Sequence, residues 1–339
     1  MTLANKYRPK IFTDVVEQGL ITNILKNICK SELSNRNFLL IGPAGTGKTT
    51  LARIIGNTLN EGECDPIEID AASNSGVDAM RDIVQQAHSY PIGHKFKIFI
   101  IDECHSLSSA AWQSLLKVLE ESPARSVFVF CTTNPEKIPS TILSRVQTFQ
   151  LSKISLEGIY NRLIYVLNEE IKDGRNITYN GEGVLFVAKL ANGGMRDALT
   201  LLDKVLVYTN DICSETVAEA LNLPNYDDYF ELLGAVAKKD NAAVISIVHN
   251  VYNSGVNFVK WFDDFHAFIM NIVKYIFLQD ISKTMIPSHY QEKISKYGAA
   301  HSSICLNLAN KLTRLNQELR STNYQQEIAL TYLCCPQKK

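Results

Sequence analysis

The stretch that decides the fold is Phe38-Leu39-Leu40-Ile41-Gly42-Pro43-Ala44-Gly45-Thr46-Gly47-Lys48-Thr49-Thr50. It contains a complete G-x-x-x-x-G-K-[ST] motif, placed directly after an apolar run and directly before a helical pattern. The glycines let successive backbone N–H groups converge on phosphate oxygens, and the start of the helix adds its positive dipole end. In this pattern Lys48 reaches the terminal phosphates and the Thr49 hydroxyl is a ligand of Mg²⁺. The stretch therefore predicts a nucleoside triphosphate site, formed by Gly42 through Thr50.

Outward from this motif, short apolar runs alternate with helical patterns over the first 150 residues. The apolar runs are 38–42, 66–70, 97–102 and 126–133, and helical patterns begin at 48, near 77 and near 109. Fully apolar strands separated by helices are typical of a parallel sheet that is covered on both faces. We therefore expect an α/β domain with a parallel sheet flanked by helices.

The second half of the chain carries a different pattern. After Leu151 the strand signals stop, and helical periodicity continues toward the C-terminus. Ser214, Pro224 and Asn225 are capping and breaker residues, and they suggest a boundary near residue 212. We therefore expect three domains: a nucleotide-binding domain at 1–150, a small helical domain at 151–212 and a second helical domain at 213–339.

Two adjacent acids, Asp102 and Glu103, end the apolar run 97–102. An acid at the carboxyl end of a strand beside a phosphate loop can hold Mg²⁺, partly through water, and the next acid can activate a water molecule. We interpret Asp102 as the metal-side carboxylate and Glu103 as the catalytic base. His105 has only Cys104 nearby at ligand spacing, so we expect it to pack or hydrogen-bond locally. Together with the phosphate loop, the acids predict ATP hydrolysis.

The overall composition is that of an ordinary globular protein. The 339 residues are 46% hydrophobic and 20% charged, with a net charge of -1, so any surface that contacts nucleic acid must be local. The chain has no apolar run of about 18 residues and its N-terminus lacks an apolar segment, which favours a cytoplasmic protein without membrane contact. The eight cysteines form no C-x-x-C pair, and we expect them to be reduced and structural.

Several further motifs fall in a fixed order along the chain. They are Lys6-Tyr7-Arg8-Pro9 with Phe12 and Asp14, the phosphate loop, Asp70-Ala71-Ala72-Ser73-Asn74, Asp102-Glu103, Thr132-Thr133-Asn134-Pro135 and Ser144-Arg145. This series closely resembles the bacterial DNA polymerase III gamma/tau family, the motor ATPase of the clamp loader. The resemblance extends over nearly the whole chain, because 193–199 fits the family's lid helix and 312–329 looks like its collar helices.

The resemblance implies an AAA+ fold with a nucleotide domain, a helical lid and a helical collar. Through the collar, five subunits would assemble into a gapped ring with other clamp-loader subunits. The implied partners are a sliding clamp and primer-template DNA, and the implied cofactors are ATP and Mg²⁺. ATP binding would open the clamp, and hydrolysis would release it on DNA as part of a DNA polymerase III-type holoenzyme.

The resemblance also assigns roles to individual residues. Arg145 corresponds to an arginine finger that reaches the ATP of a neighbouring subunit, in trans. Thr133, or alternatively Asn134, corresponds to a sensor of the γ-phosphate, and Arg196 to a lid cation that contacts bound ATP. The strip that lies against the adenine in this family corresponds to Tyr7, Arg8 and Pro9.

A DNA-contacting region is expected before and within the helix that begins near 77. Ser73, Asn74 and Ser75 lead into this helix, whose N-terminal N–H groups suit phosphates, and Arg81 is the best candidate for an ion pair with a phosphate. Similarity to the family supports this region. By family position, 88–91 is our expected contact with the clamp.

The sequence departs from the family at three places. Most members carry a four-cysteine zinc module where this chain has only the short link 59–66 with Cys64, so we expect no zinc. Val146 replaces the cysteine that follows the finger arginine, which spares Arg145. Glu17-Gln18 replaces Gly-Gln, which affects only the local detail of the adenine pocket.

Two alternative functions share part of this pattern. Another AAA+ DNA motor, for branch migration or fork maintenance, would carry the same phosphate-loop motifs but a different third domain. A non-hydrolysing structural subunit of the same loader would keep the fold and the Ser-Arg pair with a degraded phosphate loop. The intact Lys48, Thr49, Asp102 and Glu103 favour the hydrolysing subunit.

Overall fold

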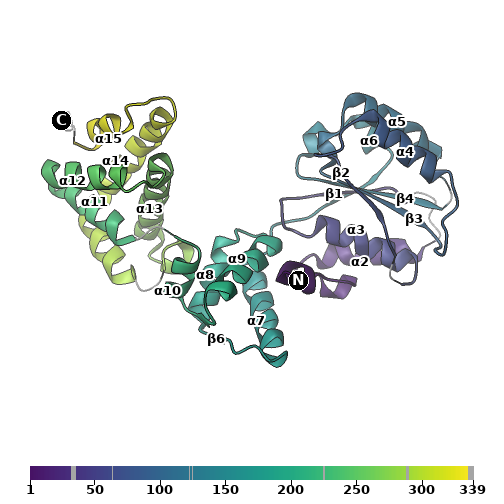
Figure 1. The fold of residues 1–339 in the computed structure, drawn as a ribbon, viewed down its shortest axis with the longest axis horizontal. Coiled ribbons are helices and arrows are strands. Elements are labelled where there is room, and N and C mark those ends of the chain that lie inside the picture. Colours follow the sequence, from purple (N-terminus) through teal and green to yellow (C-terminus); the bar gives the residue numbers. More distant parts are fainter. Residues whose placement is uncertain are drawn as a thin grey trace. The chain divides into compact units, whose positions relative to one another are not determined.

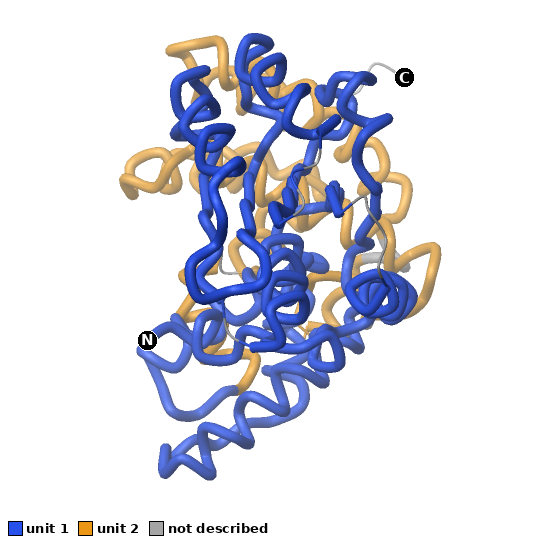
Figure 2. Tube along the Cα trace, turned by 90° about the vertical axis from the view of Figure 1, so that its right-hand side faces the viewer, with its two compact units in different colours: residues 1–212 blue, residues 213–339 orange. Residues whose placement is uncertain are grey.

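The computed structural model describes residues 1–31, 36–62, 64–121, 123, 125–223, 226–287 and 290–334. The chain divides into two compact units, residues 1–212 and 213–339 (Figure 2). Of the expected boundary residues, Pro224 and Asn225 lie outside the described part of the chain.

In the first unit, a parallel sheet of five strands, in the order β2-β3-β4-β1-β5, lies between helices (Figure 1). The strands are β1 (Phe38–Ile41), β2 (Ile67–Asp70), β3 (Lys97–Asp102), β4 (Ser126–Thr132) and β5 (Gln147–Gln150). The pairing places Leu39 beside Phe130 of β4 and Thr148 of β5. The phosphate loop therefore leaves β1 between two neighbouring strands.

Helices cover both faces of this sheet. Successive side chains of each strand point to opposite faces, so the apolar strands present a hydrophobic surface on each face. Phe99 and Ile101 pack with helices α4 (Val77–Ala87) and α5 (Ser109–Glu121). Ile98 and Ile100 pack with α2 (Gly19–Lys30) and α3 (Lys48–Leu59). The expected parallel sheet with helices on both faces is confirmed.

Three strands were missed by the sequence prediction. In β5, Gln147-Thr148-Phe149-Gln150 contains a single apolar residue, so it lacks the continuous apolar run of a buried strand. Strands β6 (Thr178–Tyr179) and β7 (Asp211–Ile212) are only two residues long and pair with each other in parallel. The expectation that strands stop after residue 151 was therefore wrong for this small ladder, which is too short to produce a pattern.

The rest of the first unit is helical. Its main helices are α7 (Leu156–Lys172), α8 (Gly181–Leu190) and α9 (Met195–Tyr208), and its shorter elements are α1 (Leu3–Lys6), η1 (Phe12–Asp14), η2 (Cys104–Ser106), η3 (Pro135–Lys137) and α6 (Ser140–Leu143). Ser155 caps α7, because its side chain accepts a hydrogen bond from the backbone N–H of Gly158. Below, "the lid" means α7, α8 and α9.

The described part of the second unit consists of helices around an aromatic core. They are α10 (Ser214–Ala220), α11 (Tyr226–Lys238), α12 (Asn241–Asn253), α13 (Phe258–Leu278), η4 (Ile281–Lys283), α14 (Gln291–Leu319) and α15 (Gln325–Cys334). Phe262, Phe265 and Phe268 of α13 are buried and pack with Tyr229 of α11. The α14 backbone leaves helical geometry at His301. No described helix of either unit has the length and apolar character that crossing a membrane requires.

Candidate nucleotide-binding site

The phosphate loop runs from Gly42 to Gly47 between β1 and α3, and glycine is required at several of its positions. Gly45 (φ +73°) and Gly47 (φ +102°) have left-handed backbone conformations. A Cβ on Gly42 would lie 2.8 Å from the backbone oxygen of Leu151, whereas a Cβ on Gly47 would meet nothing within 4 Å. The loop therefore packs against Leu151 at Gly42 and is open at Gly47, beside the first turn of α3, where a phosphate would bind.

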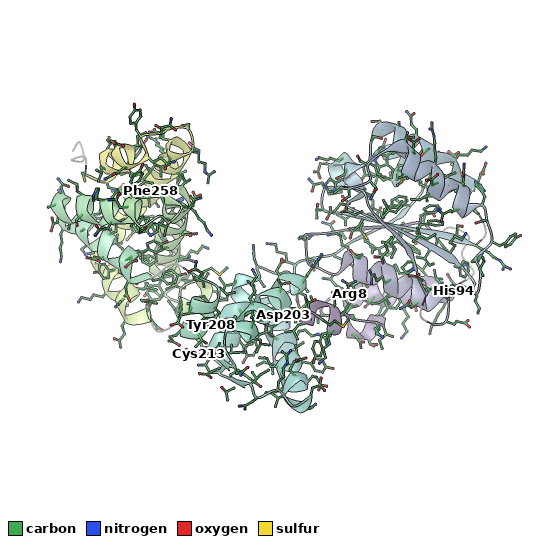
Figure 3. The ribbon with its side chains drawn as sticks, in the orientation of Figure 1. Arg8, His94, Asp203, Tyr208, Cys213 and Phe258 are labelled. Atoms are coloured by element: carbon green, nitrogen blue, oxygen red, sulfur yellow. The ribbon has the colours of Figure 1, made fainter. Side chains whose placement is uncertain are left out.

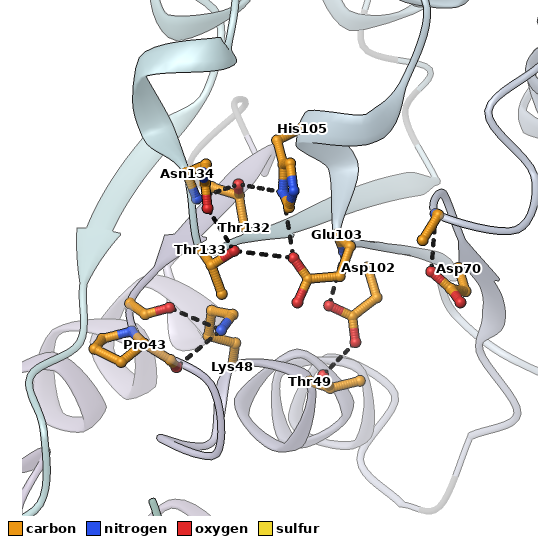
Figure 4. Close-up of polar contacts among 12 residues, drawn as sticks. Pro43, Lys48, Thr49, Asp70, Asp102, Glu103, His105, Thr132, Thr133 and Asn134 are labelled. Carbon is orange, nitrogen blue, oxygen red and sulfur yellow. Dashed lines mark hydrogen bonds and ion pairs between the residues drawn. The ribbon is translucent and has the colours of Figure 1, made fainter. Parts of the chain in front are cut away.

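Lys48, the first residue of α3, extends back into this loop. Its Nζ donates hydrogen bonds to the backbone oxygens of Gly42 (2.8 Å) and Pro43 (3.0 Å), and the residue is only 6% exposed (Figure 4). The ammonium group belongs to the first residue of a helix, so its charge and the positive end of the helix dipole lie in the same region. An anion, and a phosphate in particular, fits these surroundings.

The next residue joins the loop to the third strand. The Thr49 hydroxyl donates a hydrogen bond to Asp102 Oδ2 (2.6 Å), and Asp102 Oδ1 accepts one from the Glu103 backbone N–H (2.9 Å). A hydroxyl and a carboxylate are hard oxygen ligands, which Mg²⁺ prefers, and Mg²⁺ usually takes its other ligands from water and substrate phosphates. These residues fit Mg²⁺. Within the described ranges there is no cluster of three or more His, Cys, Asp or Glu residues that could hold a metal without such help.

Glu103 lies at the centre of a polar network (Figure 4). Its Oε2 accepts a hydrogen bond from the Thr133 hydroxyl (3.2 Å) and lies 3.2 Å from His105 Nδ1. His105 also lies 3.2 Å from the Thr132 hydroxyl, and the Thr133 hydroxyl lies 2.8 Å from Asn134 Oδ1. Glu103 itself has a left-handed backbone (φ +46°), an unusual conformation for a residue with a side chain. The sensor candidates and His105 thus gather around the expected base.

A single cavity connects the phosphate loop to the N-terminal segment and the lid. Its lining includes Tyr7, Arg8, Pro9, Ala44, Gly45, Thr46, Gly47, Lys48, Thr49, Thr50, Asp102, Glu103 and Arg196. Gly42 and Pro43 reach the site through their contacts with Lys48, and Thr133 reaches it through Glu103. The tertiary structure brings these segments together although they are distant in the sequence.

The lid touches the phosphate loop directly where α9 begins. The Met195 backbone N–H donates a hydrogen bond to the Gly45 backbone oxygen (3.0 Å), and a Cβ on Gly45 would lie 3.0 Å from the Gly194 Cα. This close approach places Arg196, the second residue of α9, in the wall of the cavity. Movement of the lid would therefore change the surroundings of the phosphates.

Some lining residues were missed by the sequence interpretation. They are Ala4, Val15, Val16, Ile154, Arg162, Met195 and Leu199. Met195 and Leu199 belong to the lid-helix motif 193–199, in which only Arg196 was expected to contact the nucleotide. The other apolar members carry no motif, and Arg162 lies on α7, where a single arginine in a helical pattern has no distinguishing signal. Their role depends on contacts that only the folded chain makes.

The remaining candidate residues lie away from the cavity lining. Arg145 follows α6 and forms an ion pair with Glu120 of α5, and its Nη1 donates a hydrogen bond to the Thr141 backbone oxygen (2.5 Å). Arg81 is exposed on α4 and pairs with Asp78 (3.1 Å).

The segment before α4 also lies outside the cavity lining. The Ser73 hydroxyl donates a hydrogen bond to Asp70 Oδ2 (3.1 Å), and the backbone oxygen of Ser75 accepts one from the Ser108 backbone N–H (3.2 Å). Ser73, Asn74 and Ser75 are exposed. These three residues lie just before α4, the helix that carries Arg81.

Comparison with known proteins relates the sequence of this chain to subunits of DNA polymerase III. Residues 158–211 match the family described as "DNA polymerase III clamp loader subunit, ATPase lid domain", and residues 63–155 match "DNA polymerase III, delta subunit". A DNA polymerase III gamma subunit of Buchnera aphidicola subsp. Schizaphis graminum is 31% identical over 91% of this chain and 90% of its own length. The chain belongs to the DNA polymerase III gamma/tau family.

Other members of the gamma/tau family are longer than this chain. The tau subunit of Bacillus subtilis is 31% identical over 97% of the chain, which spans 62% of that protein. The chain spans 52% of the gamma/tau subunit of Mycoplasma genitalium. Among solved structures, the RuvB Holliday junction branch migration motor of Thermotoga maritima has a TM-score of 0.52 at 20% identity, covering 68% of this chain and 79% of that one. This likeness establishes the AAA+ fold alone.

Proposed function

We propose that the chain is the ATPase motor subunit of a sliding-clamp loader, which opens the clamp and places it on primer-template DNA. The observation that carries the proposal is the shared cavity of Lys48, Thr49, Asp102, Glu103 and Arg196 in a member of the gamma/tau family. Residues 151–212 would act as the lid, and 213–339 as the collar of a five-membered ring.

In this proposal the residues of the cavity divide the work of binding and hydrolysis. Lys48 and the N–H groups of the loop bind the phosphates, and Thr49 and Asp102 hold Mg²⁺. When bound, Mg²⁺ supplies positive charge that offsets the charge of the phosphates. Glu103 accepts a proton from the attacking water at its carboxylate, and Thr133 orients that carboxylate through the hydrogen bond described above. Arg196 closes the cavity from the lid.

Hydrolysis would also need a neighbouring subunit. Arg145 lies outside its own chain's cavity, which supports a role in trans at the ATP of the next subunit in the ring. Ser73, Asn74, Ser75 and Arg81 would contact the DNA backbone, and 88–91 the clamp. The exposed Tyr90 (78% exposed) fits such a contact with a partner. We further propose a cytoplasmic location, with ATP and Mg²⁺ as cofactors and no zinc.

Steady-state ATPase activity of the purified chain tests this function. It would be measured with candidate ring partners, with and without sliding clamp and primed DNA. We expect clamp and primed DNA to stimulate turnover jointly. Stimulation by branched DNA alone, with no response to clamp, would instead indicate a branch-migration or fork-maintenance motor. Clamp binding with no turnover under any condition would indicate a structural subunit.

A further inference from the structure

The N-terminal segment is bonded to the lid although it also lines the nucleotide cavity. Residues 3–9 are called the strap here. The Leu3 backbone N–H donates a hydrogen bond to Asp203 Oδ2 of α9 (2.8 Å), and Arg162 Nη2 of α7 donates one to the Tyr7 backbone oxygen (3.0 Å). Figure 3 labels Asp203 on the lid and Arg8 in the strap. The strap is therefore held by both α7 and α9.

A buried carboxylate on α7, that of Glu170, also holds the strap. Glu170 is 2% exposed, and its Oε1 accepts hydrogen bonds from Lys6 Nζ (2.7 Å) and from the Tyr7 hydroxyl (2.7 Å). Its Oε2 pairs with Arg175 Nε (3.0 Å). Burial acts to raise the pKa of Glu170, but the hydrogen bonds from Lys6 and Tyr7 and the nearby positive charges outweigh it and lower that pKa. Glu170 is thus anchored as an anion.

Tyr7 connects this carboxylate to the cavity. The phosphate end of the cavity is polar, whereas Val15, Val16 and Leu199 belong to the same lining and are apolar. An apolar wall with an aromatic ring suits the flat face of a nucleobase rather than a phosphate. Burial and the bond to Glu170 raise the pKa of Tyr7 to about 12, so its hydroxyl stays a donor.

We propose that Glu170 is a positioning residue that fixes the base-binding wall by holding Tyr7 and Lys6 against the lid. Among the described residues, Glu170 is not part of the cavity lining, so its effect on the nucleotide passes through the strap. Because the strap is bonded to lid helices, the position of Tyr7 in the base-binding wall depends on the position of the lid. This inference rests on the proposed ATPase function and specifies how that site recognises a base.

The test separates binding of the base from binding of the phosphates. Equilibrium binding of Mg-ATP and of inorganic tripolyphosphate to the full chain is measured for the wild type and Glu170→Gln. Glutamine keeps the shape of the side chain but removes its charge and one acceptor oxygen. A lost hydrogen bond to a charged group corresponds to a weakening of about tenfold or more. We expect ATP binding to weaken by about tenfold and tripolyphosphate binding to change by less than about twofold.

A neighbouring glutamate on the same helix provides the matched control. Glu169 pairs with Lys172 of α7 (2.6 Å), and Glu169→Gln should leave the binding of both ligands unchanged. Tyr7→Phe, which removes only the hydroxyl, is the second variant in case Glu170→Gln does not fold. It should weaken ATP binding in the same selective way, and the double variant should lose less than the sum of the two single effects.

Two results would overturn the positioning role. If binding of ATP and of tripolyphosphate weakens equally, Glu170 stabilises residues 1–212 as a whole and not the base-binding wall in particular. If ATP binding is unchanged in both variants, the strap does not position the base-binding wall. Failure of the nucleotide site itself looks different, because the wild-type chain would then bind neither ligand, and failure of the clamp-loading role is read from the clamp- and DNA-stimulated turnover described above. The wild-type titrations therefore distinguish the two failures.

Discussion

At the scale of single residues, the site depends on how each acid is held. Asp102 is bonded to the Thr49 hydroxyl, whereas Glu103 faces Thr133 and His105. The two neighbouring carboxylates therefore have different surroundings. This difference fits a division of work between a metal ligand and a base.

Glu103→Gln tests this division. The amide can still bond to Thr133 but cannot accept a proton from water, so nucleotide binding should persist while turnover falls by about 10²- to 10⁴-fold. Equilibrium titration and single-turnover hydrolysis measure the two quantities separately. Wild-type turnover in this variant would remove Glu103 from the role of base.

The pKa of Glu170 leads to a prediction about stability. Because the folded-state pKa lies below the unfolded value of about 4.3, this carboxylate stabilises the fold above that pH, and the stabilisation is lost as the pH falls through the folded pKa. The partners Lys6 and Arg175 are exposed and stay hydrated when Glu170 loses its charge, so the cost is that of hydrogen bonds to a charged group, about 1.5–3 kcal/mol. At pH 7 we therefore expect Glu170→Gln to lower the free energy of unfolding by about that amount.

Urea unfolding at pH 7 and at about pH 3 measures this effect. The difference between wild type and Glu170→Gln should shrink at the lower pH, because the unfolded chain then binds a proton at Glu170 whereas the lowered pKa of the folded state opposes this. A difference that stays constant between the two pH values would show that packing, rather than the charge, causes the loss of stability.

At the scale of elements, the important contact is between the phosphate loop and the start of α9. Gly45 combines a left-handed backbone with a tight approach to the Gly194 Cα. A side chain at position 45 would both strain the loop and push α9 away from it. The two elements can approach only because glycines stand on both sides.

Gly45→Ala should therefore weaken nucleotide binding. The left-handed conformation costs an alanine about 1–2 kcal/mol, and displacement of α9 moves Arg196 away from the cavity. The control is Gly19→Ala at the start of α2, where a Cβ meets nothing within 4 Å. Titration with a fluorescent ATP analogue measures both variants. If the Gly45→Ala and Gly19→Ala variants bind the analogue with equal affinity, nucleotide binding does not depend on the close approach of the loop to α9.

At the scale of the whole molecule, hydrolysis is proposed to depend on more than one chain. Arg145→Ala should leave nucleotide binding intact but reduce clamp- and DNA-stimulated hydrolysis by about 10³-fold or more in the assembled ring. The measurement compares stimulated turnover of rings built with wild-type or variant chain. Normal stimulated turnover in the variant ring would exclude Arg145 as the finger.

The separate cores of the two units predict separate responses to core mutations. Phe265 is fully buried in the aromatic core of residues 213–339, and Phe265→Ala should destabilise that unit by about 3–5 kcal/mol. Hydrogen exchange should increase in that unit alone, and ring assembly should be lost, while ATP binding by residues 1–212 persists. Loss of ATP binding in this variant would show that the units depend on each other for folding.

The sequence alone determined the features that depend on short stretches of chain. The phosphate loop, the strands β1 to β4 and the acids Asp102 and Glu103 could be predicted because backbone geometry and apolar runs leave a local pattern. Strand β5 could not, since it contains one apolar residue and is an edge strand that is defined by its pairing with β1. The positions of Tyr7 and Arg196 were expected only through the family resemblance.

The tertiary structure alone decided which distant residues meet. Lys6 and Glu170 are separated by 164 positions, and neither residue carries a local signal of the other. The same holds for Arg162 and the Tyr7 backbone, which are 155 positions apart. A buried carboxylate must find its positive and hydrogen-bonding partners wherever the fold places them, because its desolvation is otherwise too costly. Such pairings follow from three-dimensional packing, and a local sequence pattern therefore does not contain them.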